Sequence, residues 1–570
     1  MGLYDHCLLA LLLFLCINLS SSSFSQGKEP RYVTADAEEV SGMSFEYIVV
    51  GGGTTGCPLA ATLSEKFSVL LVERGGSPYG NPLITDRESY GFSLLQTDEY
   101  SSVAQGFVSE DGVGNLRGRV LGGSSAINGG FYSRASEDFV KQAGWEEKLV
   151  QDSYKWVESR VVSTPELTPW QTVVEFGFLE AGVLPYNGFS LEHIPGTKIG
   201  GSIFDQFGKR HSSANLLEAG NPSNITVLLN ATVKSLIFHD RSKQINNILA
   251  RFLIKNKFFF TVNSHTKFSK VIFIAGDGNE SRVCGIKYMK SDGSTDQIYE
   301  AYINQPENTS SWGDVILSAG ALGSPQILLL SGIGPRKHIE KFNISTMVDL
   351  KVVGKEMKDN PSIALLVDPS PESPQIRQPE PPLVAAIASN FKFIIEAGVI
   401  PISFNSTRMP IAAKIAFPES KGTLKLQSTD PRKNPLVKFN YLTKKEDLDE
   451  CVNMVSVLEH VARSESVSFF LGNQPQHKYL TRSEDELKQF CRDNVRTYYH
   501  FHGGCVVGRV IDQDYRVLGV EGLRVIDGST LIESPGTNPM ATLMMLGRYQ
   551  GIKILRQRKR VSAFVTHRSP

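Results

Sequence analysis

The sequence predicts a mixed α/β fold that combines a Rossmann-like domain with at least one further domain. Three observations lead to this expectation. Residues 45–73 read as strand, glycine turn, helix and strand, with apolar strands expected at 47–50 and 69–72, which is the rhythm of a βαβ unit. Residues 313–335 repeat the strand, glycine turn and helix. The chain has 570 residues, too many for one simple core, so we expect two or more domains.

The turn of the first unit carries a nucleotide-binding pattern. Gly51, Gly53 and Gly56 form GxGxxG, so bare backbone and a helix N-terminus can approach a pyrophosphate. Glu73 ends the second strand, where an acidic side chain can accept hydrogen bonds from a ribose hydroxyl. A structural tight turn is the alternative. The preceding strand, the following helix and the terminal acid together favour dinucleotide binding.

The overall charge is balanced. The 59 basic and 59 acidic residues cancel, so no global field favours nucleic acid or an anionic membrane, and we expect neither as a partner. The basic cluster of Arg556, Arg558, Lys559 and Arg560 is local, and we expect residues 556–570 to form a solvated tail. No set of Cys and His residues shows metal-ligand spacing, so no metal site is expected.

The N-terminus resembles a secretory signal. An apolar run at 8–19 is followed by serines, is shorter than a membrane span and predicts a signal peptide over 1–26. Because no Lys or Arg precedes the run, a signal anchor is the alternative. We expect a secreted protein without a stable membrane span in the mature chain.

Secretion would permit N-glycosylation and disulfide formation. The N-x-S/T triplets after the signal begin at Asn224, Asn230, Asn279, Asn308, Asn343 and Asn405. Of the five cysteines that would remain, Cys57 and Cys505 sit inside glycine motifs as small packing residues. An odd set is no disulfide scaffold, and if one bridge forms we expect it between Cys451 and Cys491.

A second glycine-rich segment lies at 115–134. Its core at 122–130 offers small residues, hydroxyls and one amide, as a flat ring system bound by backbone and short polar side chains would need. A flexible loop is the alternative. Apolar and aromatic residues at 120–121 and 131–132 bracket the core and favour a ligand-binding segment over a linker.

The other elements are predicted from the periodicity of apolar residues and from the glycines and prolines that interrupt it. We expect a helical pattern at 137–162, extended runs at 224–238, a strand at 315–317 with a turn at 318–323 and a helix at 326–330, a loop or domain crossing at 361–382, a strand and turn at 422–442, and helices at 446–465 and 483–494. Residues 239–270 lack stable periodicity and lie between two strand-like runs, so we interpret them as an insertion in a hairpin.

The carboxyl end brings polar groups together. Residues 497–508 place His500 beside a glycine turn, and Asn538-Pro539 opens a helix expected to run through Ile554. His500 can take a proton from a hydroxyl, and Asn538 can hold the same oxygen. A satisfied structural histidine and an Asn-Pro turn are the alternatives. Because His500 and Asn538 occur together with three other glycine motifs, we favour a catalytic role for them.

Four motifs in order carry a family resemblance. They lie at 49–65, 109–134, 318–335, and 498–508 with 523–549. Residues 44–555 resemble the glucose-methanol-choline (GMC) flavoproteins, in the branch of plant (R)-mandelonitrile lyase-like and HOTHEAD-like proteins. The resemblance implies the GMC fold, with an FAD-binding domain at 44–160, 202–350 and 498–555 and a β-sheet-based substrate (cap) domain at 161–201 and 351–497.

The resemblance also implies the site residues. His500 would be the catalytic base, Asn538 would be the second catalytic position, Tyr498 would contact substrate, and His502 would support the site near the substrate. FAD would be lined by Gly51, Gly53, Thr54, Thr55, Gly56, Glu73, Arg74, Val120, Ser124, Asn128, Gly129, Gly130, Phe131, Val233, Tyr499, His500, Gly528, Asn538 and Pro539.

Two departures from the family pattern bear on function. The second catalytic position is histidine in the lyases, whereas Asn538 cannot relay a proton. The hairpin insertion at 239–270 is the other departure. We therefore expect an FAD-dependent enzyme that oxidises the CH-OH group of a small aryl or long-chain alcohol by proton removal and hydride transfer to flavin. We expect it to be a monomer. A hydroxynitrile lyase cleaving a cyanohydrin with FAD in a structural role is the first alternative, and a non-catalytic flavin-binding protein is the second.

Overall fold

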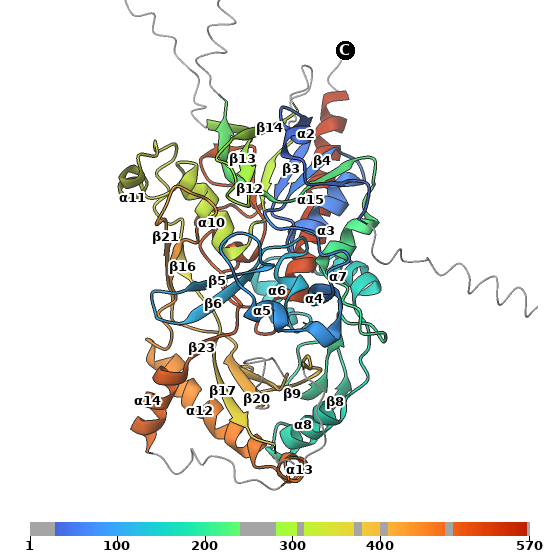
Figure 1. Ribbon diagram of the computed structural model, residues 1–570, viewed down its shortest axis with the longest axis vertical. Helices are drawn as coiled ribbons and strands as arrows, with labels where there is room; N and C mark the ends of the chain where they lie inside the picture. Colours follow the sequence, from blue (N-terminus) through green and yellow to red (C-terminus); the bar gives the residue numbers. More distant parts are fainter. Residues whose placement is uncertain are drawn as a thin grey trace, which may run out of the picture.

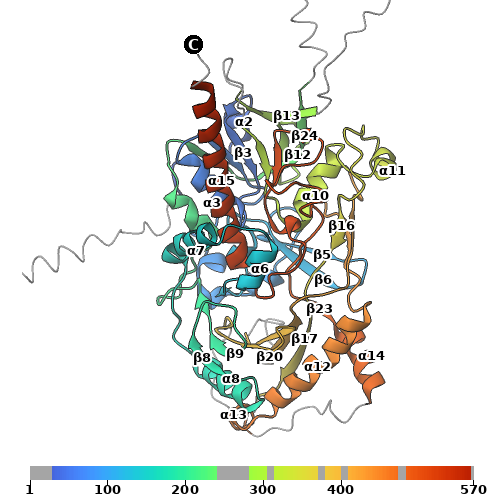
Figure 2. The ribbon, with the colours of Figure 1, turned by 180° about the vertical axis from the view of Figure 1, so that it is seen from behind.

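The chain forms two parts that meet along its middle (Figure 1). The computed structural model describes residues 29–239, 281–304, 313–369, 379–398, 409–472 and 483–566. A parallel sheet and its helices make the upper part, and a mainly antiparallel sheet backed by helices makes the lower part. Figure 2 shows the same division from behind.

The parallel sheet confirms the expected βαβ core. Its six strands are all parallel and lie in the order β1 (Val33–Thr34), β11 (Ile225–Leu228), β4 (Val69–Val72), β3 (Tyr47–Val50), β15 (Val315–Leu317) and β25 (Leu523–Val525). Every residue of β3, β4 and β15 is buried. Strands covered on both faces require continuous apolar runs, which is the sequence pattern seen here.

Two helices pack closely against each other beside this sheet. These are α3 (Gly56–Ser64) and the long C-terminal α15 (Met540–Thr566), which runs upward to the C-terminus in Figure 1. A Cβ on Gly547 would lie 2.3 Å from the Thr55 carbonyl oxygen, and one on Gly551 would lie 2.7 Å from the Thr62 side chain. The two glycines therefore allow the close approach. The helix also continues past Ile554 into the segment expected as a tail.

The expected helical pattern at 137–162 is divided into two helices. They are α6 (Glu137–Gln142) and α7 (Glu147–Val161). Gly144 between them has φ +67°, a left-handed conformation that ends the first helix.

A hairpin lies beside the parallel sheet, as the insertion hypothesis requires. Strand β12 (Ala231–Phe238) pairs antiparallel with β13 (Ser281–Lys290), and β14 (Tyr299–Ile303), β2 (Ser44–Phe45) and β24 (Val520–Glu521) join them. The insertion therefore connects two paired strands. Residues 240–280, which include most of it, lie outside the described residues.

The lower part is a seven-stranded sheet. Its strands lie in the order β23 (Arg496–Thr497), β17 (Pro361–Val367), β20 (Met409–Ile415), β19 (Phe393–Glu396), β18 (Val384–Ile387), β9 (Gly196–Ile199) and β8 (Tyr186–Phe189). Helices α8 (Pro169–Glu180), α12 (Lys445–Ala462), α13 (Glu465–Phe470) and α14 (Glu484–Asn494) cover it. The expected loop at 361–382 was wrong at its start, because residues 361–367 form strand β17, which pairs with β20 on one side and β23 on the other.

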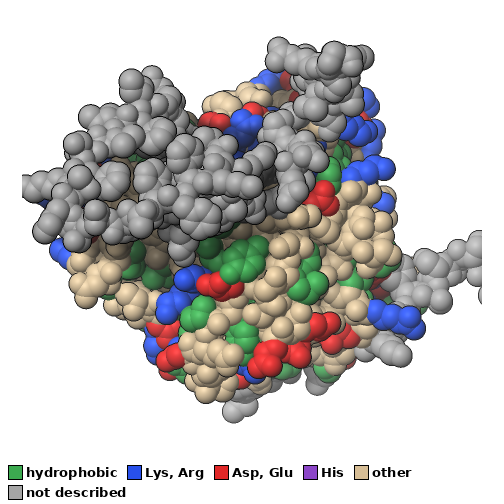
Figure 3. Space-filling view, turned by 90° about the horizontal axis from the view of Figure 1, so that it is seen from above, with side chains coloured by type: hydrophobic (Ala, Val, Ile, Leu, Met, Phe, Trp, Pro, Cys, Tyr) green, Lys and Arg blue, Asp and Glu red, His purple; other side chains and the backbone are tan. Residues whose placement is uncertain are grey.

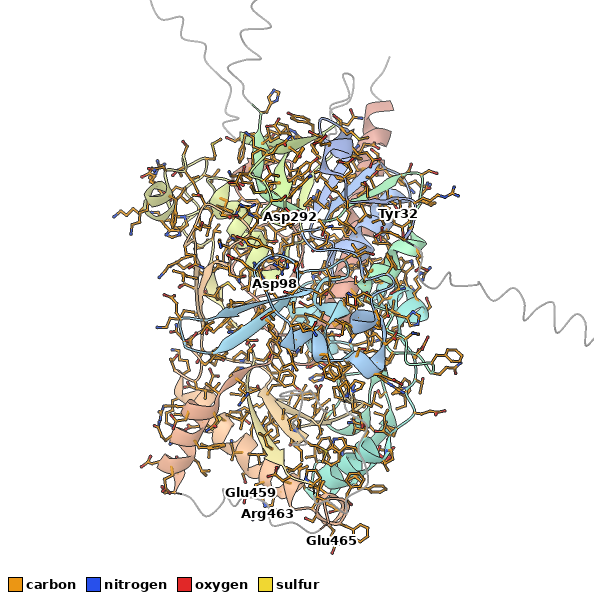
Figure 4. The ribbon with its side chains drawn as sticks, viewed as in Figure 1. Tyr32, Asp98, Asp292, Glu459, Arg463 and Glu465 are labelled. Atoms are coloured by element: carbon orange, nitrogen blue, oxygen red, sulfur yellow. A yellow bond between two sulfur atoms is a disulfide. The ribbon has the colours of Figure 1, made fainter. Side chains whose placement is uncertain are left out.

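The helices of the lower part are tied together covalently. Cys451 on α12 and Cys491 on α14 form a disulfide, which confirms the expected pairing. Ser483 begins α14 with a capping box to Glu486. Figure 4 labels Glu459 and Arg463 at the lower end of the molecule, where they form an ion pair on α12 and its C-cap.

The second glycine unit differs from its prediction. Helix α10 (Gly320–Leu330) begins six residues before the expected Gln326 and includes Pro325. The Asp527 carboxylate accepts a hydrogen bond from Gly320 N at 2.9 Å and from Ser324 Oγ at 2.5 Å. A partner distant in sequence therefore anchors the helix start, which local pattern could not reveal.

The outer surface carries both signs of charge. Figure 3 shows Lys and Arg side chains interspersed with Asp and Glu on the upper face. Across the described residues, no helix combines the length and apolar character that crossing a bilayer requires.

Candidate active site

The GxGxxG turn lies between β3 and α3 and is packed against a second glycine turn. A Cβ on Gly56 would lie 1.9 Å from the Gly51 carbonyl oxygen, and a Cβ on Gly51 would lie 2.4 Å from the Ser318 carbonyl oxygen. Gly51 also has φ +106°. Only glycine fits at these positions, so α3 starts directly against the end of β3.

Gly53, the second glycine of the pattern, faces a more open space. The nearest atom to a Cβ on Gly53 would be Gly123 Cα at 3.8 Å. Gly123 opens the short helix η2 (Gly123–Ala126), so the two predicted glycine segments meet here. Ser213 Oγ donates to the Thr54 carbonyl at 2.9 Å and holds the turn from outside. The first turn of α3 carries no acidic residue, which suits an anionic group at its N-terminus.

Glu73 occupies the predicted place at the end of β4 and is buried. Its carboxylate accepts hydrogen bonds from Gly52 N at 2.9 Å and Gly75 N at 2.8 Å. Burial raises its pKa, and the two N–H groups and Arg74 oppose that rise. Each carboxylate oxygen keeps a second lone pair for a ribose hydroxyl. Arg74 turns aside and donates to Gln105 Oε1 at 2.6 Å.

Residues 120–131 connect the upper part to the lower sheet. Asn128 Oδ1 accepts from Gly130 N at 3.0 Å and from buried Arg210 at 3.1 Å. Ser124 Oγ accepts from Gly118 N at 3.1 Å. Phe131 packs with Ala385, Ile387 and Ile394 of the lower sheet. The segment is therefore a built structure and not a flexible linker.

His500 lies in the loop after β23, between the two parts. Its backbone N–H donates to Asp359 Oδ1 at 2.8 Å, and Asp359 also accepts from the Thr497 and Tyr441 hydroxyls at 2.6 Å. On the imidazole, Nδ1 lies 3.2 Å from Lys414 Nζ. Within the described chain, Nε2 has no hydrogen-bond partner. The ring is thus fixed from one side and presents Nε2 on the other.

Glu396 on β19 connects the two other candidate residues. Its carboxylate accepts from Tyr498 Oη at 2.8 Å and from Asn538 Nδ2 at 2.9 Å. A carboxylate only accepts, so this contact fixes which end of the Asn538 amide faces it. Asn538 Oδ1 is buried and has no partner among the described residues. This oxygen is therefore free to accept a hydrogen bond from a bound molecule.

His502 supports the same loop. Its Nδ1 lies 3.0 Å from the His500 carbonyl oxygen, which makes Nδ1–H the donor. Its backbone bridges to Lys358, and its Nε2 is buried without a partner in the described part of the chain. Burial lowers the pKa of His502 to about 4.

The ionisable groups around His500 are strongly perturbed by burial. Burial, Lys414 and His502 lower the pKa of His500 well below its ordinary value. Burial lowers the pKa of Lys414 to about 7, while Glu396 and Asp359 raise it. Burial raises the pKa of Glu396, and Lys414 opposes this. Groups whose pKa is strongly shifted by burial and by specific charged neighbours are typical of catalytic sites.

Three predicted residues lie apart from this cluster. Tyr499 has φ +62°, and its 44% exposed ring lines a cavity of about 800 Å³ with Phe107 and Asn434. Val233 is buried on β12 within the main core. Gly528 lies in the turn that follows β25, next to Gly503 N, which donates to its carbonyl at 3.3 Å. Their contacts with a cofactor stay predictions.

Sequence reasoning missed Lys414, Glu396 and Asp359. Two of them stand in otherwise apolar strands, FIIE at 393–396 and MPIAAKI at 409–415. A single charge in a buried strand is unusual, and this was the available signal.

A glycine-rich turn at the end of a parallel strand, together with a buried histidine loop beside a second sheet, is an arrangement typical of a dinucleotide-dependent enzyme. Models of the GMC oxidoreductase family match residues 45–362 and 418–547. The chain therefore belongs to the GMC oxidoreductase family and binds FAD.

Relatives and solved structures agree with this assignment. The (R)-mandelonitrile lyase-like protein of Arabidopsis thaliana is 40% identical, covering 93% of both chains. Protein HOTHEAD of the same plant is 38% identical, covering 97% of this chain and 98% of the relative. Sinalpyl alcohol oxidase Nec3 of Nesocodon mauritianus is 37% identical, covering 90% and 89%. Formate oxidase of Aspergillus oryzae has the same fold, with a TM-score of 0.71 at 18% identity over 91% of this chain and 100% of that one.

The residues present fit FAD. The crowded Gly51 and Gly56, the open side of Gly53, and the unopposed N-terminus of α3 form a cradle for its pyrophosphate. Glu73 would hold the adenosine ribose. Bound FAD supplies a two-electron acceptor for hydride.

Proposed function

We propose that this enzyme oxidises the CH-OH group of a small aryl or long-chain alcohol, with His500 as the base and Asn538 as the residue that positions the hydroxyl. The proposal depends on one observation: His500 Nε2 and Asn538 Oδ1 both lack a hydrogen-bond partner among the described residues. The other side of the His500 ring contacts Lys414, and the other side of the Asn538 amide contacts Glu396. A hydroxyl has a single hydrogen, so the two acceptors take it in turn: Asn538 Oδ1 orients the substrate O–H, and His500 Nε2 then removes the proton.

In this mechanism Asn538 and His500 contact the substrate, and Glu396 and His502 hold them in place. Asn538 Oδ1 accepts the substrate O–H in the initial complex and orients it. His500 Nε2 then removes the hydroxyl proton while the carbinol carbon gives up hydride. Buried Glu396 keeps the Asn538 amide from turning over. His502 donates to the His500 carbonyl and fixes the loop, so we assign it a supporting role.

A hydroxynitrile lyase remains the second candidate, because several relatives are named (R)-mandelonitrile lyases and a buried Lys414 lies beside His500. Asn538, however, cannot relay a proton as a histidine can, which favours oxidation over cyanohydrin cleavage.

Anaerobic mixing of the yellow holoenzyme with substrates separates the candidates. A CH-OH oxidoreductase would be bleached by aryl or long-chain alcohols. A lyase would release cyanide from mandelonitrile while its flavin stays oxidised. A holoenzyme that does neither across an alcohol and cyanohydrin screen would refute both activities and support the flavin-binding alternative.

Replacement of His500 by Ala tests the base directly. We expect flavin bleaching to slow by about 10³-fold, because a positioned general base contributes about 10²–10⁴-fold. FAD should still bind, since the cradle lies in other elements. Absorbance at the flavin bands checks cofactor content, and stopped-flow absorbance checks the rate. Unchanged bleaching in H500A would remove His500 from this role.

We further propose that the protein is a secreted, N-glycosylated monomer. The Cys451–Cys491 disulfide is compatible with an oxidising compartment. Asn230 and Asn343 are exposed at turns with left-handed backbone, where a glycan can be accommodated. Expression in a secreting plant cell, N-terminal sequencing and enzymatic deglycosylation would test this. Intracellular retention of an unprocessed, unmodified chain would contradict it.

A further inference from the structure

Lys414 is a buried lysine whose amino group is directed at His500. It lies on β20, and its side chain is fully buried. Nζ is 3.2 Å from His500 Nδ1 and 2.9 Å from the Thr537 carbonyl oxygen. Among the residues that the structure describes, no carboxylate comes within ion-pair distance of Nζ. Its charge is therefore not held by a direct partner.

The protonation state of Lys414 decides what His500 can do. A charged ammonium has donors only, so it donates to Nδ1 and forces the neutral imidazole to carry its proton on Nε2. That tautomer cannot accept the substrate proton. A neutral amine can donate to the Thr537 carbonyl and accept from Nδ1–H, which leaves a lone pair on Nε2. Only this second state is a competent base.

We propose that His500 and Lys414 act as one base, in which neutral Lys414 holds His500 in its Nδ1–H tautomer and stores the proton taken from the substrate. The inference rests on the proposed alcohol oxidation. The alcohol O–H bond breaks and an N–H bond forms at Nε2. The Nδ1 proton passes to Nζ, and hydride leaves the carbinol carbon for FAD. Lys414 is thus a positioning residue that acts through His500.

The surroundings of Lys414 favour storage of that proton on the amine. Glu396 faces it from β19 and Asp359 from the residues before β17, and both carboxylates stabilise an ammonium. The Tyr498 ring centroid lies 5.6 Å from Nζ. His193 and His502 also face it, and Lys414 contributes to the lowered pKa of each. With the pKa of Lys414 at about 7 and that of His500 well below its ordinary value, the lysine is the stronger base.

The first test does not depend on turnover. Oxidised holoenzyme with ¹⁵N-labelled histidine is titrated from pH 5.5 to 9, and the His500 ring signals are assigned by their loss in H500A. We expect the protonated nitrogen to change from Nε2 to Nδ1 as the pH rises through about 7. A tautomer that stays the same over this range overturns the proposal.

Substitutions separate proton storage from simple positive charge. Lys414→Arg keeps the charge but cannot lose its proton. It should hold His500 in the Nε2–H tautomer up to pH 9 and slow alcohol bleaching by at least about 10²-fold. Lys414→Met should abolish the tautomer change near pH 7. Lys198→Met is the matched control, because Lys198 is a buried lysine of the same sheet that donates to Ser133 Oγ at 2.8 Å.

The outcomes distinguish this inference from the proposed function. Bleaching of K414R at the wild-type rate, or a tautomer change in K414R like that of the wild type, overturns the inference and leaves alcohol oxidation intact. A wild type that no alcohol bleaches overturns the proposed function, while the histidine titration still tests the pair. If K414R fails to fold, the wild-type titration and K414M decide.

Discussion

At the scale of single residues, the site depends on charges that are buried together. Glu396 holds Asn538 and Tyr498, and Asp359 accepts hydrogen bonds from the His500 backbone and two hydroxyls. Each group lies in a low-dielectric region, where an unpaired charge would be costly. The network is therefore both structural and electrostatic, and changing one charge should alter the titration of its neighbours.

Replacement of Glu396 by Gln tests this coupling. The carboxylate raises the pKa of Lys414, so its removal should lower that pKa and favour neutral Lys414 at lower pH. We expect the acid limb of the flavin bleaching rate to move down by about one pH unit, which corresponds to about 1.4 kcal/mol. Glu380→Gln is the control, because Glu380 is a buried glutamate of the lower part that accepts a hydrogen bond from Thr168 Oγ1. An upward shift in E396Q would contradict the assignment.

The sequence predicted some of these residues and not others for a physical reason. His500, Tyr498 and Asn538 stand in local motifs, and the structure links all three through Lys414 and Glu396. Lys414 and Glu396 are single charges in apolar strands, and their meaning depends on strand pairing. In the β19–β20 register Lys414 lies opposite Ile394. Glu396 is two residues further along β19, so its side chain points to the same face of the sheet as that of Lys414. Only the folded sheet shows that both charges reach the histidine loop.

At the scale of elements, glycines determine how closely strand and helix can meet. Strands β3 and β4 were predicted to the residue, because continuous apolar runs between glycine and polar signals leave few alternatives. Helix α10 was predicted too short, since Asp527 anchors its start from a distant segment. Elements that depend on neighbouring residues are predictable from sequence, and those anchored across the fold are not.

Replacement of Gly56 by Ala tests the cradle. The new Cβ would lie 1.9 Å from the Gly51 carbonyl oxygen, so β3 and α3 must separate. We expect a loss of about 3 kcal/mol or more in unfolding free energy and little bound FAD. Gly114→Ala is the matched control, because a Cβ there meets no atom within 4 Å. Cofactor content by absorbance and thermal melting measure both. A yellow, stable G56A protein would show that the turn does not bind the pyrophosphate.

Removal of the Cys451–Cys491 bridge tests the connection between α12 and α14. The bridge closes a sequence separation of 40 residues, so the double Ala variant should lose about 2–4 kcal/mol of stability. Cys284→Ala removes a buried free thiol without a bridge and should lose about 1 kcal/mol. Urea denaturation followed by tryptophan fluorescence compares them. Equal losses in both variants would mean that the bridge adds nothing beyond its packing.

At the scale of the whole molecule, the candidate active site combines residues from both parts. The cradle belongs to the upper part, Lys414 and Glu396 belong to the lower sheet, and His500 lies on the loop between them. Both parts are assembled from segments that alternate along the chain. Contacts between the two parts should therefore support stability and FAD binding together.

Phe131 provides the sharpest test of that dependence. Its ring is 4% exposed and packs on Ala385, Ile387 and Ile394, while a Cβ on Gly200 would lie 2.4 Å from it. Replacement by Ala should cost about 3–5 kcal/mol, as for other buried aromatic residues. The loss should appear in the FAD-free protein too, because the contact joins protein to protein. Phe207→Ala, at a side chain 77% exposed, is the control and should melt like the wild type. If F131A lost stability only when FAD was present, Phe131 would act through the cofactor. The contact between the upper and lower parts would then depend on other residues.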